Sequence, residues 1–184
     1  MKKGFTLIEL LAVIVILGVL LAIAVPSVTK YINSSKKNTY IDNAQTYATT
    51  ATYQANLGTF KFPINGNTAT VISFGKLVDH LEKGGKTSPY GTAYISDNSF
   101  VVIVNDGSAE SPHYTTYIAA IDEQGYGIGT LKDDGTATAA TIAYNDLTTD
   151  NIVQLPSGAG KEMPAKGAKI TLNGTEFTIT EVVK

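Results

Sequence analysis

The side chains that could act as catalysts or metal ligands are few, and they do not stand at the spacings that known active sites or metal sites require. The two histidines, His80 and His113, are far apart and lack the spacing of zinc ligands. The acidic turns at 133–135 and 145–146 do not follow the EF-hand loop pattern, and solvated turns explain them better than a calcium site. No G-x-S-x-G motif, phosphate loop or pair of catalytic acids occurs. We therefore expect no catalytic residue, no metal ligand and no cofactor, and no enzyme.

Glu9 is the one titratable residue with an unusual setting. It precedes sixteen residues without a polar side chain, 10–25, and the uncharged stretch continues to Thr29. Residues 10–29 are enough to cross a hydrocarbon core of ~30 Å as a helix. The twelve Leu, Ile and Val residues of 10–25 favour insertion by about 4–7 kcal/mol, and Glu9 opposes it by at most ~3 kcal/mol. We predict a membrane span whose carboxylate needs a partner that nothing nearby in the sequence supplies.

A secretory signal peptide is the alternative interpretation of this N-terminus. Lys2 and Lys3 would form its basic region, and Ala22-Ile23-Ala24 is a usable cleavage site that would leave Val25 at the mature start. Glu9 would interrupt its apolar region, however, and the helical pattern continues beyond the cut. We therefore favour the membrane span.

The segment from Lys3 to Leu10, K-G-F-T-L-I-E-L, resembles the class III signal of type IV pilins and the related pseudopilins. Gly4 stands before the cut of that family, Phe5 at the aromatic mature start, and Glu9 at the fifth mature position. The resemblance implies cleavage between Gly4 and Phe5 by a prepilin peptidase that also N-methylates Phe5. It further implies a leader in the cytoplasm, a head outside the cytoplasmic membrane, and assembly by a platform and ATPases into an extracellular helical homopolymer.

Cleavage would give Glu9 its partner. The new amine of Phe5 could pair with Glu9 of a neighbouring subunit, and this pairing would offset the cost of a charge in apolar surroundings. Gly18 and Pro26 lie where the family carries helix-weakening residues, and Pro26 removes a backbone donor at roughly 3 kcal/mol in an ordinary helix. We expect this stretch to unwind in the filament, with a tolerated kink as the alternative.

The elements that position these residues follow from the pattern farther along the chain. Apolar residues, most of them Ala, recur at spacings of 3 and 4 from Ile41 to Ala55, and Leu57-Gly58 ends the helix. We predict a leader over 1–4, a helix over 5–57 and a globular β-sheet head over 58–184. Within the helix, 5–29 would form the membrane span and filament core, and 30–57 an amphipathic half. The fold class is α+β, the type IV pilin fold, with the helix packed on an antiparallel sheet.

The head is predicted in pieces. We expect a loop over 58–72, then a short helix capped by Ser73 and stopped at Gly84-Gly85. Strand patterns predict hairpins of 93–95 with 100–104 and of 114–121 with 126–131, in a four-stranded antiparallel sheet with 100–104 at its centre. A strand is expected over 152–155, and 132–167 is otherwise unassigned. Asn173-Gly174 predicts a type I′ turn between 170–172 and 175–183, with Ile170 opposite Phe177.

Composition narrows the function. The net charge is −2 and every basic residue is Lys, which argues against specific nucleic-acid binding. The absence of Cys excludes the disulfide loop of many pilins, and the chain resembles pilins of Gram-positive bacteria in this respect. The resemblance implies the major pilin of a type IV pilus used in adhesion, aggregation or twitching motility. A minor pilin, a type II secretion pseudopilin, a membrane-anchored or secreted binding protein and, less favoured, a DNA-capturing competence pilin stay open.

Overall fold

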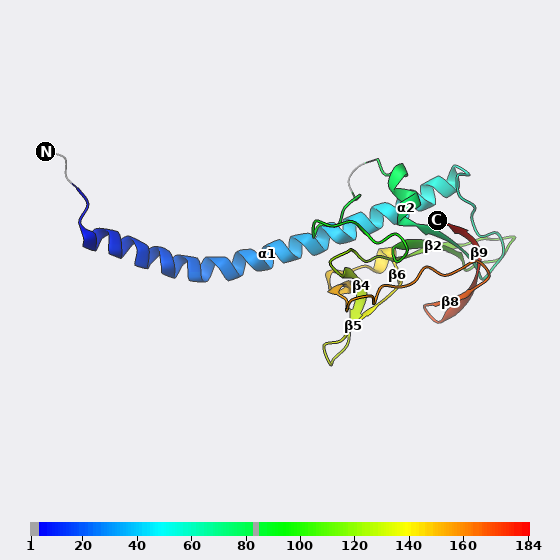
Figure 1. Ribbon diagram of the computed structural model, residues 1–184. Coiled ribbons are helices and arrows are strands. Elements are labelled where there is room, and N and C mark those ends of the chain that lie inside the picture. Colours follow the sequence, from blue (N-terminus) through cyan, green and yellow to red (C-terminus); the bar gives the residue numbers. More distant parts are fainter. Residues whose placement is uncertain (1–3, 83–84) are drawn as a thin grey trace. The chain divides into compact units, whose positions relative to one another are not determined.

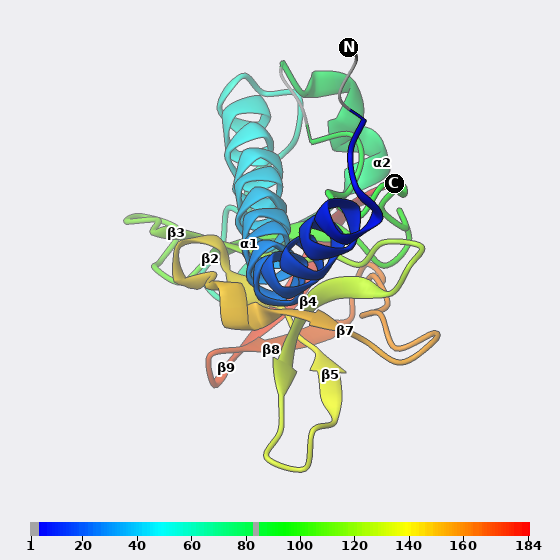
Figure 2. The same ribbon diagram turned by 90° about the vertical axis from the view of Figure 1, so that its left-hand side faces the viewer.

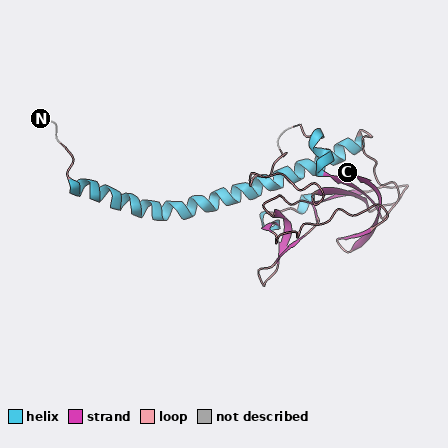
Figure 3. Cartoon of the chain, in the orientation of Figure 1, coloured by secondary structure: helices cyan, strands magenta, loops and turns pink. Residues whose placement is uncertain are grey.

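The computed structural model describes residues 4–82 and 85–184 and divides into two compact units, residues 1–36 and 37–184. The long helix α1 (Leu7–Asn56, 50 residues) begins in the first unit and ends in the second (Figure 1). All other helices and strands of the described residues belong to the second unit. Figure 3 colours the helices and strands by type. The confirmed fold class is α+β, with a long N-terminal helix and a sheet-containing head.

In the first unit, α1 is apolar and uncovered. The described residues contain one helix long and apolar enough to cross a membrane, and none of its most apolar window, of mean hydropathy 3.1, is buried. The helix runs unbroken through Gly18 and Pro26. Two hydroxyls donate to carbonyls around Pro26, Ser27 Oγ to Ile23 O at 3.3 Å and Thr29 Oγ1 to Val25 O at 2.9 Å.

The second unit is built on a six-stranded sheet of order β6-β3-β2-β1-β9-β8. Its strands are β1 (Thr68–Ser73), β2 (Phe100–Asn105), β3 (Tyr114–Ala119), β6 (Ile142–Ala143), β8 (Lys169–Leu172) and β9 (Thr175–Val183). All neighbouring pairs are antiparallel except β1 with β9, which are parallel. The prediction of a four-stranded antiparallel sheet was therefore wrong, because the last strand returns to pair beside β1. The interior position predicted for 100–104 is confirmed, since β2 is buried along its whole length.

A second sheet of three strands has the order β5-β4-β7, with β4 (Tyr126–Leu131) between β5 (Ala137–Ala139) and β7 (Ile152–Gln154). The predicted strand over 152–155 is thus confirmed as β7. The predicted hairpin of 114–121 with 126–131 is wrong beyond its turn. Only a bridge between Ile121 and Gly127 joins the two segments, because β5 and β7 occupy both edges of β4. Figure 2 shows the β4–β5 turn projecting from the strands.

The core lies between α1 and one face of the larger sheet. Within the second unit the buried helix residues are Tyr40, Ala44, Tyr47, Ala48, Ala51 and Ala55. They pack with residues such as Ile72, Val101 and Ile103. The alternate strand residues, among them Val71 and Val102, form a second cluster with Phe177 on the other face. The small Ala side chains on the buried face of α1 let the helix backbone approach the sheet closely.

Local predictions met different outcomes. The loop expected over 58–72 ends early, because 68–73, which includes the β-branched residues Thr68, Thr70, Val71 and Ile72, forms β1, one of the interior strands. The expected pairing of 93–95 with 100–104 is wrong: Ala93 bridges Thr87 and Tyr94 bridges Asp122.

Two other local predictions are confirmed. Ser73 caps α2 (Phe74–Leu77), which continues as the 3₁₀ turn η1 (Val78–His80). The helical element ends at His80, earlier than the predicted stop at Gly84-Gly85, of which Gly84 lies outside the described residues. Asn173 (φ 47°) and Gly174 (φ 81°) form the predicted turn, with Ile170 opposite Phe177. The remaining 3₁₀ turns are η2 (Tyr144–Asp146) and η3 (Thr149–Asn151).

Candidate assembly site at the start of α1

Thr6 and Glu9 close the first turn of α1. The backbone N–H and the hydroxyl of Thr6 both donate to Glu9 Oε2, each at 2.8 Å, and the Glu9 N–H donates to Thr6 Oγ1 at 3.3 Å. This arrangement is a capping box, in which a Thr at the N-cap and a Glu three residues later satisfy orphan groups of the helix start. The expectation that no nearby residue supplies a partner for Glu9 was therefore wrong. The T-L-I-E spacing was the sequence signal for it.

The capping box leaves Glu9 able to accept more. Both bonds from Thr6 fall on Oε2, and within the described part of the chain no hydrogen bond reaches Oε1. The neighbouring side chains are exposed: Phe5 is 92% exposed, Leu7 84% and Ile8 73%. The helix N-terminus itself favours an anion at this position. A cation delivered from another molecule would find an ordered carboxylate with a free oxygen.

The other residues singled out from the sequence lie apart from this turn. Gly4 precedes the helix and is exposed, and a Cβ there would meet nothing within 4 Å. The Gly4–Phe5 bond is thus open to an enzyme. Gly18 lies within the apolar part of α1, and Pro26 lies near the C-terminal end of that apolar part. Both residues are exposed. The structure brings together Thr6 and Glu9 but leaves Gly18 and Pro26 at a distance along the helix.

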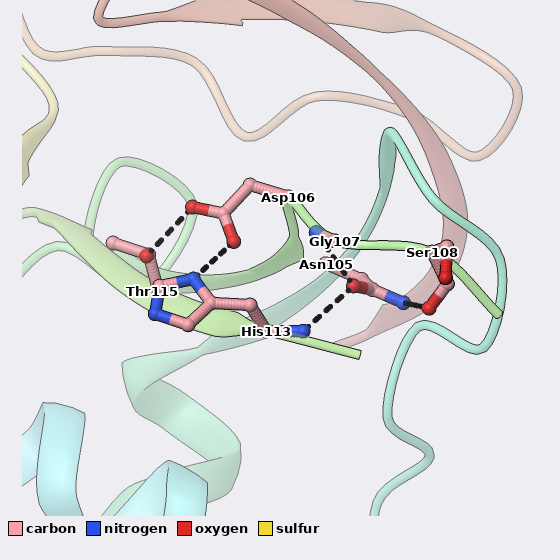
Figure 4. Close-up of polar contacts among 6 residues, drawn as sticks. All are labelled: Asn105, Asp106, Gly107, Ser108, His113 and Thr115. Carbon is pink, nitrogen blue, oxygen red and sulfur yellow. Dashed lines mark hydrogen bonds and ion pairs between the residues drawn. The ribbon is translucent and has the colours of Figure 1, made fainter. Parts of the chain in front are cut away.

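The two histidines serve the head in separate places. His80 packs edge-on against Phe60, with ring centroids 5.7 Å apart. His113 Nδ1 contacts Asp106 Oδ1 in the loop between β2 and β3, and Asp106 Oδ2 accepts a bond from the Thr115 hydroxyl at 3.0 Å (Figure 4). Among the described residues no group of three His, Cys, Asp or Glu could hold a metal ion.

Asn105 organises the same loop and was not anticipated from the sequence. Its side chain is buried, and its Oδ1 accepts from the backbone N–H of Gly107 at 3.0 Å and of His113 at 3.2 Å (Figure 4). Its Nδ2 donates to Ile64 O at 3.0 Å and to Ser108 O at 3.4 Å. These contacts tie the β2–β3 loop to the segment that follows α1, and they are structural rather than catalytic.

The fold and the site define a class of protein: a chain with a long N-terminal helix whose first half is apolar and unburied, a self-capped carboxylate in the first turn of that helix, and a sheet-containing head. Comparison with known proteins agrees. The family model for the prokaryotic N-terminal methylation motif matches residues 1–25. The chain is 29% identical over 174 residues to the type IV major fimbrial protein FimA of Dichelobacter nodosus, covering 90% of this chain and 92% of that protein. No solved structure gives a significant match.

The motif at the N-terminus and the similarity along the chain are both similarities to type IV pilins. Proteins of that family are structural subunits and not enzymes.

Proposed function

We propose that this chain is the major pilin of an extracellular type IV pilus. The observation that carries the proposal is the apolar half of α1, which begins at a single ordered carboxylate and whose most apolar window is not buried by any of the described residues. So much exposed apolar surface needs either lipid or other subunits around it. A membrane supplies the first before assembly, and a bundle of copies supplies the second in the filament.

Processing would prepare the site. A prepilin peptidase would cut between Gly4 and Phe5 and methylate the new amine, which stays cationic. The 1–4 leader would be removed. Residues 5–57 would then carry the membrane span and filament core in 5–29 and pack on the head in 30–57. Before assembly the chain would cross the cytoplasmic membrane once, with its head outside. An assembly platform and its ATPases would extract it.

Glu9 would then act in two states. In the membrane the Thr6 donors satisfy Oε2, which lowers the cost of an isolated carboxylate in an apolar phase. In the filament the amine of Phe5 from a neighbouring copy would reach Oε1 and form a charge-assisted bond. Because this pairing requires one axial offset between subunits, it would select the register of the filament.

Gly18 and Pro26 would supply the weak stretch of the helix. Unwinding there would lengthen the subunit once it has left the lipid. Ser27 and Thr29 already bond the carbonyls of Ile23 and Val25, so part of the freed backbone keeps hydrogen bonds. The assembled filament would serve adhesion, aggregation or twitching motility.

Mass spectrometry of filaments sheared from the cell surface tests the proposal. The expected species is the dominant protein of that fraction and begins at N-methylated Phe5. A minor component with this N-terminus would indicate a minor pilin or a type II secretion pseudopilin instead. A secreted protein beginning at Val25 would contradict the proposal and support a binding protein released by a signal peptidase.

A further inference from the structure

Apolar side chains of the head are exposed around one cavity. The cavity has a volume of about 510 Å³ and opens where α1 ends, between the 58–65 segment, β1 and β9. Its walls include Ala55, Phe60, Phe62 and Ile64. Ile64 is 73% exposed at its rim, and Leu57 of the same segment is 60% exposed. Tyr114, also exposed, packs on Phe62 with ring centroids 4.5 Å apart.

One exposed aliphatic side chain of the head lies elsewhere. Leu131, at the end of β4, is 63% exposed. Within the described head residues the other large exposed apolar side chains are Ile64 at the cavity, Tyr114 against Phe62, Tyr53 in the last turn of α1 and Leu57 just after it. Figures 1 and 2 both show the β4–β5 turn remote from the end of α1. Leu131 therefore cannot fill the cavity of its own chain.

The turn that carries Leu131 is preorganised. Lys132 N donates to Thr136 O at 2.9 Å, and Gly135 N donates to Lys132 O at 2.9 Å. Thr136 N donates to Asp134 Oδ1 at 2.8 Å. Hydrogen bonds from Thr136 also hold the pKa of Asp134 below its ordinary value, so this carboxylate stays charged. A rigid projection loses little conformational entropy when it docks.

The charges of the two features are complementary. Asp133 and Asp134 follow Leu131 closely and are exposed, and Lys61 lies at the wall of the cavity and is exposed. Glu181, also at the cavity wall, is paired with Lys166 at 3.6 Å. An apolar projection flanked by carboxylates thus matches an apolar cavity flanked by an ammonium group.

We propose that the cavity at the end of α1 receives the β4–β5 turn of a second copy of this chain, with Leu131 inside it and Asp133 beside Lys61. The inference rests on the proposed function as a filament subunit and adds a specific contact between heads. The two surfaces differ, so the contact is heterologous, and each copy offers one projection and one cavity. Such contacts propagate into open helical filaments when the rotation does not close a ring.

Disulfide trapping tests the contact directly, because the chain contains no cysteine. The variant combines Leu131→Cys with Ile64→Cys, two exposed positions at which the fold does not depend on the side chain. Filaments sheared from cells and oxidised should give a ladder of covalent oligomers in non-reducing electrophoresis. The matched control combines Leu131→Cys with Lys169→Cys, an exposed β8 position outside the cavity, and should stay monomeric.

The outcomes separate the contact from the function. Filaments that form normally but give no ladder overturn the contact and leave the pilin function intact. Failure of the unmodified chain to appear in sheared filaments overturns the function itself. A ladder equal to that of the control pair also overturns the contact, since it would report random collision.

A charge reversal decides the case if the cysteine variants do not assemble. Lys61→Glu should lower the yield of sheared filaments several-fold, and adding Asp133→Lys should restore it. Asp133 is chosen because Asp134, and not Asp133, holds the turn through Thr136. Recovery in the double variant supports the contact, and a yield that stays as low as in Lys61→Glu alone overturns it.

Discussion

Thr6 and Glu9 satisfy each other at the first turn of α1, with the N–H and the hydroxyl of Thr6 each 2.8 Å from Glu9 Oε2. Glu9 therefore has two separable roles. Glu9 caps its own helix, and any hydrogen-bond acceptor at that position could do this. It is also proposed to pair with the amine of Phe5 from a neighbouring subunit, and this role requires a negative charge.

Glu9→Gln separates these roles. Glutamine is an accepted partner in a capping box, so α1 should begin as before and the subunit should reach the membrane. Because the amide carries no charge, the sheared filaments should be lost or strongly reduced. Subunit levels in the membrane and in the sheared fraction, compared by immunoblot, measure the effect. Wild-type filament yield from Glu9→Gln would mean that the cap alone matters, and Thr6→Ala would then be the more damaging change.

Asp122 is a buried carboxylate that holds the β4 side of the head together. It is fully buried and accepts from Ser88 Oγ at 2.5 Å, Tyr126 N at 2.9 Å and Gln124 N at 3.0 Å. Asp122→Ala would leave these donors without an acceptor, and we expect the free energy of unfolding to fall by at least about 1–3 kcal/mol. Denaturant titration of the full chain in detergent measures this. Asp133→Ala, at an exposed turn, is the control and should change little.

The correct predictions share one property: they depend on neighbours in the sequence. Ser73 caps the helix that follows it, and Asn173-Gly174 supplies the two positive φ angles of its own turn. The capping box of Thr6 and Glu9 is equally local and could have been predicted from its spacing. In each case the physical cause acts within a few residues, so the pattern suffices.

Apart from the capping box, the missed features are non-local. Nothing in 68–73 indicates that it will pair with 178–183, and this parallel pairing decides that the sheet has six strands. Asn105 looks like an ordinary strand end, yet its amide joins the β2–β3 loop to Ile64 O. The separation of β4 from β3 likewise depends on competition by β5 and β7 for the edges of β4. Such choices are settled by packing across the whole head.

Gly58 offers a test of the helix end. It has φ +78°, and Thr59 N donates to Gln54 O at 3.0 Å while Gly58 N donates to Ala55 O at 3.0 Å, the two bonds of a Schellman motif. A Cβ there would meet nothing within 4 Å, so Gly58→Ala should cost only the left-handed conformation, roughly 1 kcal/mol. Gly58→Asn should cost less, because Asn tolerates this region. Equal stability of Gly58→Ala and wild type in denaturant titration would contradict this account.

Alkaline pH should unfold the head through its buried tyrosines. Burial raises the pKa of Tyr47 to about 12 and also raises the pKa values of Tyr40 and Tyr94. The unfolded chain ionises near the ordinary value of about 10, so the stability from these groups is complete below that pH. It is then lost as pH rises toward the folded-state pKa values, because the unfolded state releases protons first.

Tyr47→Phe removes one of these buried, ionisable hydroxyl groups. The ring and its stacking on Phe74, at a centroid distance of 3.6 Å, are retained, but the ionising hydroxyl is removed. Between about pH 10 and pH 12 the variant should lose stability less steeply than wild type, by up to one proton's slope. Denaturant titrations across this range, with tyrosinate absorbance to follow ionisation, provide the measurement. Tyr53→Phe, at a 58% exposed position, should keep the wild-type slope. If Tyr47→Phe also kept it, the assignment of the alkaline transition to this buried ring would fail.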